Sequence, residues 1–247
     1  MQIRGITLEE YTTFLESNQG ILVDYKSDPV YCANKNVEIL GGFVGTLCKA
    51  VAVIEGTTIP QGILAVREYY IQTFIEELER VYPKKLTVYK RAYPQIIQIV
   101  PELKNKDLGI KFYQYKDMTP QYWKYLQMLC YISTKKHHNF ENIKSLLHMF
   151  EGHCYIVFAW YEQIPVSCGV YIETNTDMIE LFCGSDRVYD YLFPEDNIEL
   201  AISSFTKKNL RMSKSEITQV YYTKPARRVA NLMHRWLSDK VYSNKDK

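Results

Sequence analysis

The chain has 247 residues, a formal net charge of +2 and 47% hydrophobic residues, enough for one large domain or two small ones with a substantial core. Its six cysteines are scattered with no close pair, which is typical of reduced thiols and argues against a zinc ribbon or a disulfide framework. The N-terminus lacks the apolar core of a signal peptide, and every apolar run is far shorter than the roughly 20 residues of a membrane span. We therefore predict a cytoplasmic protein without a membrane span.

Positive charge is concentrated toward the C-terminal end of the sequence. Residues 203–247 contain eleven Lys or Arg and three Asp or Glu, a net charge of +8, so residues 1–202 carry a net charge of −6. A basic segment of this kind can meet a phosphate-bearing partner. The alternative is a solvated helix face followed by a frayed tail, and composition alone leaves both interpretations open.

The N-terminal part is predicted to alternate helices with short strands. Thr7 followed by Glu9 and Glu10 is typical of a helix N-cap with an acidic first turn, so we expect a helix to about Ser17. Apolar residues at spacings of three to five, with charges between them, predict a second helix over Val66–Val81. β-rich runs predict strands at Ile21–Tyr25, Val37–Leu40, Phe43–Ile54 and Lys85–Ala92.

Residues 100–120 contain two prolines, several lysines and no clear period, and they are the candidate domain boundary. We expect an N-terminal α/β half over residues 1–115 and a second domain over residues 116–247. The second half is predicted to run helix, helix, three antiparallel strands, helix, strand, helix, an order that favours the α+β class. Its helices are expected at Pro120–Ser133, Phe140–Phe150, Pro194–Lys208 and Pro225–Leu237, and its strands at Cys154–Trp160, Pro165–Glu173, Met178–Gly184 and Ile217–Tyr222.

Several stretches of the second half resemble the acyltransferase-like domain of the Fem peptidoglycan-bridge transferases, a branch of the GNAT superfamily. They share the order of elements, a return strand in which a polar residue and a proline precede small residues, and a third strand that ends in Gly-Ser. The stretches are Tyr125–Leu129, Ile132–Lys136, Ile156–Ala159, Gln163–Gly169, Ile179–Ser185, Asn197–Phe205 and Glu216–Tyr221. The resemblance implies a GNAT-like mixed, mostly antiparallel sheet flanked by helices, with residues 1–115 as a truncated or divergent first GNAT-like copy.

The resemblance also implies where an acyl donor would bind. In such folds, small residues on central strands let a thioester or aminoacyl ester approach the backbone, whose N–H groups can hold the carbonyl oxygen as charge develops. Ser167, Cys168 and Gly169 are the residues at that place. The phosphate-cradling signature of CoA-dependent GNAT enzymes, Arg/Gln-x-x-Gly-x-Gly/Ala, is absent from the sequence. Aminoacyl-tRNA and acyl-CoA are thus the candidate donors, and the missing signature argues against CoA.

Amide formation by acyl transfer requires polar side chains that can move the protons of the acceptor amine. Glu180, Asp186 and Tyr171 are the candidates on or beside the predicted strands. Ser185 and Arg187 lie at a strand end, where we expect donor or substrate binding. The alternatives are a Glu180 that faces solvent and a plain Asx-type turn after the strand.

The basic C-terminal segment supplies candidate phosphate contacts at Lys207, Arg211 and Lys214, with Tyr221 as a stacking residue. In Fem-like chemistry the polyanion would be an aminoacyl-tRNA. The histidines do not match the spacing of a zinc motif, so the sequence predicts no metal site.

The sequence thus predicts an acyl- or aminoacyltransferase that joins a small-molecule or peptide amine to an activated carbonyl. Two hypotheses from other classes stay open. One is a GNAT-like binding module that has lost catalysis, which the missing phosphate signature favours. The other is a nucleic-acid-associated protein that uses only its basic C-terminal face, with tRNA as one candidate partner.

Overall fold

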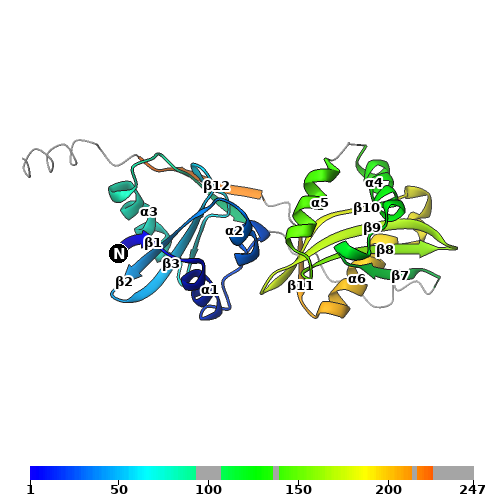
Figure 1. Ribbon diagram of the computed structural model, residues 1–247, viewed down its shortest axis with the longest axis horizontal. Coiled ribbons are helices and arrows are strands. Elements are labelled where there is room, and N and C mark those ends of the chain that lie inside the picture. Colours follow the sequence, from blue (N-terminus) through cyan, green and yellow to red (C-terminus); the bar gives the residue numbers. More distant parts are fainter. Residues whose placement is uncertain (93–106, 136–138, 213–215, 225–247) are drawn as a thin grey trace, which may run out of the picture. The chain divides into compact units, whose positions relative to one another are not determined.

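The computed structural model describes residues 1–92, 107–135, 139–212 and 216–224, and Figure 1 shows their helices and strands. Contacts between residues divide the chain into two compact units. The first unit contains Met1–Phe14, Val37–Lys90 and the described chain from Thr218 onward, and the second contains Leu15–Asn36 and Arg91–Ile217. Each unit therefore includes segments that are far apart in the sequence.

The first unit contains a four-stranded sheet in the order β1-β2-β3-β5 and a three-stranded sheet in the order β12-β6-β4. Helix α3 packs with these sheets through Phe74, Ile75 and Leu78, which are buried in one core with strand residues such as Ala52 and Val88. The element bounds are β1 Gln2–Gly5, α1 Leu8–Glu16, β2 Glu38–Val44, β3 Leu47–Ile54, β4 Thr58–Ile59, β5 Ile63–Ala65, α3 Tyr69–Val81, β6 Thr87–Ala92 and β12 Glu216–Tyr222. Helix α1 begins in the first unit and ends in the second.

Gly41 and Gly42 lie inside β2, although the sequence predicted separate strands before and after them. A Cβ added to Gly42 would lie 2.6 Å from the Phe74 ring and 2.6 Å from the Met1 sulfur, so side chains of the first unit occupy the space that a larger residue would need. The turn falls instead at Gly45, whose φ of +62° suits glycine. The apolar run expected as one strand over Phe43–Ile54 is therefore the end of β2, a turn and β3.

The strand predicted at Ile21–Tyr25 is wrong. Residues 21–24 form neither strand nor helix, and the chain continues as a 3-10 helix, η1 (Tyr25–Ser27), and then a short helix, α2 (Pro29–Asn34). The Asp28 carboxylate accepts a hydrogen bond of 2.8 Å from the Val30 N–H, and Pro29 occupies the first turn of α2. An N-cap aspartate followed by proline begins a helix because the carboxylate satisfies an otherwise free N–H and proline does not need its own.

The second unit is built on a five-stranded sheet in the order β11-β10-β9-β8-β7. Its pairs are antiparallel except β10 with β11, which run parallel. Figure 1 shows α4 and α5 on one face of this sheet and α6 on the other. The bounds are β7 Gly109–Tyr113, η3 Tyr115–Asp117, α4 Pro120–Thr134, α5 Phe140–Met149, β8 Cys154–Tyr161, β9 Ile164–Glu173, β10 Asp177–Ser185, η4 Arg187–Leu192, α6 Pro194–Thr206 and β11 Asn209–Met212.

These elements confirm the predicted α+β class with a mixed, mostly antiparallel sheet flanked by helices. The predicted division after residue 115 falls inside the second unit, because β7 pairs with β8 from Gly109↔Trp160 to Tyr113↔Ile156. The helix predicted at Pro225–Leu237 lies outside the described residues. That the first unit is a divergent or truncated copy of the second stays a prediction.

Within the described ranges, none of the helices has both the length and the apolar character needed to cross a bilayer.

Candidate active site

Tyr171 and Glu180 form the centre of the candidate site. They are register partners on the antiparallel strands β9 and β10, so their side chains project from the same face of the sheet. The Tyr171 hydroxyl lies 3.5 Å from Glu180 Oε2, at the long end of the hydrogen-bond range. Tyr171 is fully buried and Glu180 is 6% exposed. The structure therefore brings together two of the three predicted proton-transfer residues and buries Glu180, which could have faced solvent.

Gly169 makes room for Tyr171. A Cβ at Gly169 would lie 2.6 Å from the Tyr171 hydroxyl oxygen and 2.6 Å from its Cε2. Residues two apart on a strand share a face, so the tyrosine ring lies over the glycine. The Tyr171 ring thus occupies the space that a side chain at Gly169 would need.

The predicted donor contacts of Ser167 and Cys168 do not fit the structure well. Strand β9 is central, with β8 hydrogen-bonded on one side and β10 on the other, so its backbone N–H groups are engaged in the ladders. The Ser167 hydroxyl donates to the Gly184 carbonyl at 3.1 Å. Cys168 is fully buried beside Cys130, and burial raises the pKa of its thiol. Ser167 and Cys168, like Gly169, thus make contacts within the second unit.

The end of β10 carries the next polar contacts. The Ser185 hydroxyl donates to Glu195 Oε1 at 2.7 Å, which ties the first turn of α6 to the strand. The Asp186 carboxylate accepts from the Val188 N–H at 3.1 Å and caps η4. This contact is the Asx-type turn considered as the alternative for Asp186. Arg187 is exposed immediately after it.

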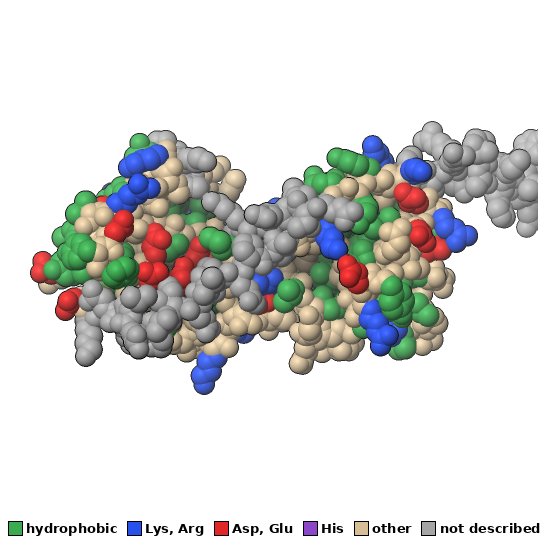
Figure 2. Space-filling view, turned by 180° about the vertical axis from the view of Figure 1, so that it is seen from behind, with side chains coloured by type: hydrophobic (Ala, Val, Ile, Leu, Met, Phe, Trp, Pro, Cys, Tyr) green, Lys and Arg blue, Asp and Glu red, His purple; other side chains and the backbone are tan. Residues whose placement is uncertain are grey.

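A small cavity lies at this end of the strand. It has a volume of about 360 Å³, and its lining includes Ser133 from α4, Ser185 from β10 and Glu195 from α6. Arg187, Asp190 and Asp196 also line it, so its charged groups are mainly acidic. On the face of the second unit that is seen in Figure 2, several acidic side chains gather.

Glu199, on α6, is a polar residue of this region that the sequence did not single out. It lies four residues after Glu195, which places both carboxylates on one side of the helix. Burial raises the pKa of Glu199 to about 7, with further contributions from the negative charges of Glu180, Asp196 and Glu195. The sequence did contain a signal for Glu199. Like charges four residues apart on a helix are unfavourable, and α6 carries such a pair while it also buries Ile198 and Ile202.

The predicted basic group does not form one surface. Lys207 is exposed at the C-cap of α6. Arg211 is buried, with Nη2 donating to Asp177 Oδ2 at 2.7 Å and to the Val23 carbonyl at 3.4 Å, which does not fit a solvent-facing phosphate contact. Lys214 lies outside the described residues. Tyr221 belongs to the first unit and packs against its core.

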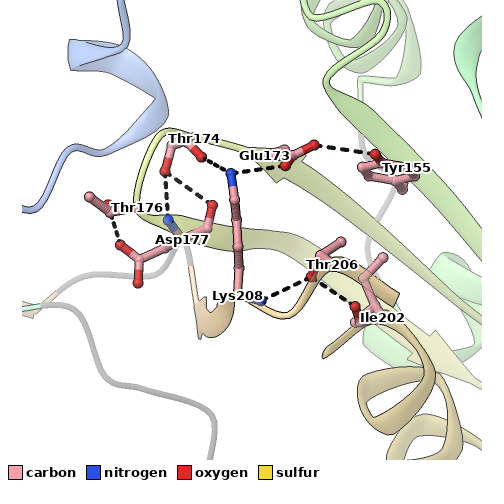
Figure 3. Close-up of polar contacts among 8 residues, drawn as sticks. All are labelled: Tyr155, Glu173, Thr174, Thr176, Asp177, Ile202, Thr206 and Lys208. Carbon is pink, nitrogen blue, oxygen red and sulfur yellow. Dashed lines mark hydrogen bonds and ion pairs between the residues drawn. The ribbon is translucent and has the colours of Figure 1, made fainter. Parts of the chain in front are cut away.

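Lys208, next to Lys207, is also engaged within the second unit, as Figure 3 shows. Its ammonium donates to the Thr174 carbonyl at 2.6 Å and pairs with Glu173 Oε1 at 2.9 Å. These contacts hold the turn between β9 and β10 to the start of β11. Two basic residues of the segment that follows α6 thus stabilise the fold of the second unit.

Among the residues that the structure describes, no group of three or more His, Cys, Asp or Glu side chains is arranged to hold a metal ion. The adjacent His137 and His138 lie outside those residues.

No family model matches the chain, and no curated protein matches its sequence. Its fold is similar to that of the solved structure of FemX, with a TM-score of 0.53 and 7% identity over 92% of this chain and 96% of that one. A GNAT-family acetyltransferase from Colwellia psychrerythraea gives a TM-score of 0.48 at 9% identity, over 88% of this chain and 90% of that one. A tandem GNAT protein from the clavulanic acid biosynthesis pathway gives 0.47 at 9% identity, with the same coverage of 88% and 90%. The fold of this chain is therefore similar to that of FemX, as the resemblance to the Fem transferases implied.

Proposed function

We propose that the chain is an acyl- or aminoacyltransferase that forms an amide by attack of an amine on a thioester or aminoacyl ester carbonyl. The observation that carries the proposal is the buried contact between Tyr171 and Glu180 on the central strands of a Fem-like fold. Buried titratable side chains that contact each other are an arrangement typical of active sites.

The chemistry requires a neutral amine and a source of protons for the leaving group. In the proposal Glu180 and Tyr171 act as a pair: the Tyr171 hydroxyl donates to Glu180 Oε2, and the carboxylate takes the proton that the attacking amine loses and passes it to the leaving group. Asp186 keeps its predicted catalytic role only as a secondary candidate, because its carboxylate caps η4. Ser185 and Arg187 remain candidate binding residues at the end of β10.

The start of α6 favours an aminoacyl ester over a CoA thioester. A helix that follows a strand can hold a phosphate on its free N–H groups. Here the first turn of α6 contains Pro194, which has no N–H, and the acidic side chains of Glu195 and Asp196. These residues already complement the positive end of the helix dipole and would repel a diphosphate. Together with the missing glycine signature, they argue against CoA as the donor.

In the experiment, the purified protein is incubated with a panel of peptide and small-molecule primary amines. The donor is either radiolabelled acetyl-CoA or a mixture of labelled aminoacyl-tRNAs. We expect labelled amide from the aminoacyl-tRNAs, and a rate loss of about 10²-fold to 10⁴-fold in Glu180→Gln. Tyr171→Phe removes only the hydroxyl oxygen and tests the role of Tyr171. Glu162→Gln, at an exposed turn, is the matched control for Glu180→Gln.

Failure of both donors in the assay, without stabilisation of the protein by either, would favour the binding-module hypothesis. Equal stabilisation by charged tRNA, uncharged tRNA and random RNA would favour a nucleic-acid-associated protein.

A further inference from the structure

A second and larger cavity of the second unit lies at the start of β10. Its volume is about 650 Å³, within the range of about 300–1,000 Å³ that is usual for ligand sites. Asp177 is one of its lining residues and lies three positions before Glu180 on the same strand. Because side chains alternate along a strand, Asp177 and Glu180 project from opposite faces of the sheet. The cavity is therefore separate from the contact between Tyr171 and Glu180.

Two walls of this cavity come from segments that are far apart in the sequence. One wall is the end of α1 with the loop after it, up to Val23, and the other is residues 175–177 with Asn209 of β11. All of these residues belong to the second unit. Arg211 connects the two walls, because its Nη2 donates to Asp177 Oδ2 at 2.7 Å and to the Val23 carbonyl at 3.4 Å. The frame of the cavity is therefore fixed by the fold.

Asp177 supplies a hydrogen-bond acceptor to one wall. Its side chain is 3% exposed, and both Arg211 and the Thr176 hydroxyl donate to Oδ2. Within the described part of the chain, no hydrogen bond reaches its Oδ1. Thr174 fixes the backbone of Asp177, accepting from its N–H at 3.2 Å and donating to its carbonyl at 3.1 Å, as Figure 3 shows. Since a buried carboxylate oxygen gains from a donor, the cavity favours a ligand that brings an N–H group.

The opposite wall supplies backbone groups. Leu22 lines the cavity and is 57% exposed, and neither its N–H nor its carbonyl is hydrogen-bonded to any residue that the structure describes. The side-chain amides of Gln19, Asn175 and Asn209 also line the cavity, and each offers both donors and an acceptor. A peptide group likewise carries one donor and one acceptor. The polar groups of the cavity thus complement those of a peptide main chain.

The charges and apolar side chains of the lining narrow the class of ligand further. Among the described residues that line the cavity none is a lysine or an arginine, whereas Glu16 and Asp177 carry carboxylates. An anionic ligand would therefore meet like charge. Arg211 already compensates the charge of Asp177, so the ligand does not have to be a cation. Leu15 and Ile21 add aliphatic surface, which suits an uncharged ligand with an apolar side chain.

We propose that this cavity binds an uncharged stretch of extended peptide that carries an aliphatic side chain. Successive N–H groups of an extended chain point to opposite sides, so one donates to Asp177 Oδ1 and the next faces the wall that contains Leu22. The aliphatic side chain contacts Leu15 and Ile21. In peptide sites of this kind, main-chain hydrogen bonds supply affinity and the side-chain contacts supply specificity. The site does not depend on the proposed transferase function, because it lies away from Tyr171 and Glu180.

The test titrates the full chain, labelled with nitrogen-15, with N-acetyl-leucine N′-methylamide, a neutral leucine that is flanked by two peptide groups. We expect saturable shifts of the side-chain amide signals of Asn175 and Asn209 in NMR spectra, with a Kd of about 1 mM for a ligand of this size. N-acetyl-leucine methyl ester lacks one of the two N–H groups and should bind about 10-fold more weakly. N-acetyl-leucine, an anion, should bind at least about 5-fold more weakly.

A pair of surface variants tests the place of binding without disturbing the buried ion pair. Leu22→Ala removes aliphatic surface from the cavity wall and should weaken binding of the methylamide by about 5-fold. Ile164→Ala, at a residue that is 49% exposed in the turn before β9, is the matched control and should leave the Kd unchanged. Thermal melts check that both variants fold.

Four results would overturn the proposal. They are an absence of saturable shifts up to about 20 mM methylamide, equal binding of the methyl ester, equal affinities of the two variants, and tighter binding of N-acetyl-leucine. Leucine N′-methylamide, which carries an ammonium group, is the last probe. If it binds more tightly than the blocked compound, the cavity is a cation site and the assignment to uncharged peptide is wrong.

Discussion

Removing the charge of Arg211 is expected to destabilise the second unit strongly. Arg211 Nη2 lies 2.7 Å from Asp177 Oδ2, and the two side chains are 2% and 3% exposed. Arg211→Met leaves the Asp177 carboxylate buried without its cation, although the Thr176 hydroxyl still donates to it. The variant also loses the contact of 3.4 Å with the Val23 carbonyl, which connects β11 to the segment before α2. Breaking a buried pair of this kind costs about 3–5 kcal/mol.

Urea unfolding followed by tryptophan fluorescence is the assay, because Trp123 and Trp160 both lie in the second unit. The double variant Arg211→Met with Asp177→Asn removes both charges and should recover at least about 2 kcal/mol of the loss. Arg187→Met, at an exposed arginine, is the matched control and should change stability by less than about 0.5 kcal/mol. A loss below 1 kcal/mol in Arg211→Met, or additive losses in the double variant, would refute the assignment of a coupled buried ion pair.

Three further variants test the second unit. Glu162 and Gln163 have φ values of 45° and 69°, a backbone conformation that asparagine and glycine adopt more easily. The variant Glu162→Asn with Gln163→Gly should therefore raise the free energy of unfolding by about 1 kcal/mol and Tm by about 2–4 °C in a thermal melt. Gly169→Ala should cost about 2 kcal/mol in urea, because its Cβ would lie 2.6 Å from the buried Tyr171 ring. The pKa of Glu199 is raised from 4.5 to about 7, so its ionisation destabilises the fold as pH rises between those values. Glu199→Gln should therefore be more stable than the parent at pH 8 by about 1 kcal/mol, after allowance for solvent screening, and should show no such gain at pH 4.

Much of the second unit could be predicted from sequence because its signals are local. The strands β8, β9 and β10 are apolar runs bounded by turn residues, and their ends fall within one or two residues of the predictions. The N-cap Asn139 accepts from the Asn142 N–H at 3.3 Å, as its position before α5 predicted. Signals of this kind depend on neighbours in the chain, so the sequence contains them.

The errors occurred where distant residues decide the structure. β7 lies in a stretch with no clear period, and its strand form depends on pairing with β8 about 45 residues later. Gly42 looked like a strand break, yet it lies inside β2 because Met1 and Phe74 occupy the space next to it. Neither contact can be read from the residues within a few positions of the element it decides.

The candidate site shows the same limit on residue function. Glu180 and Tyr171 could be nominated because strand alternation predicts which residues share a face, but their common face depended on the register of β9 with β10. Arg211 was nominated as a phosphate contact from charge alone, and its partner Asp177 lies on a neighbouring strand 34 residues away. Glu199 was missed because its carboxylate matters only through the carboxylates that the fold gathers around it. The ionisation of a buried carboxylate depends on charges that other elements supply. This is why the sheet could be predicted from spacing, whereas the raised pKa of Glu199 follows only from the structure.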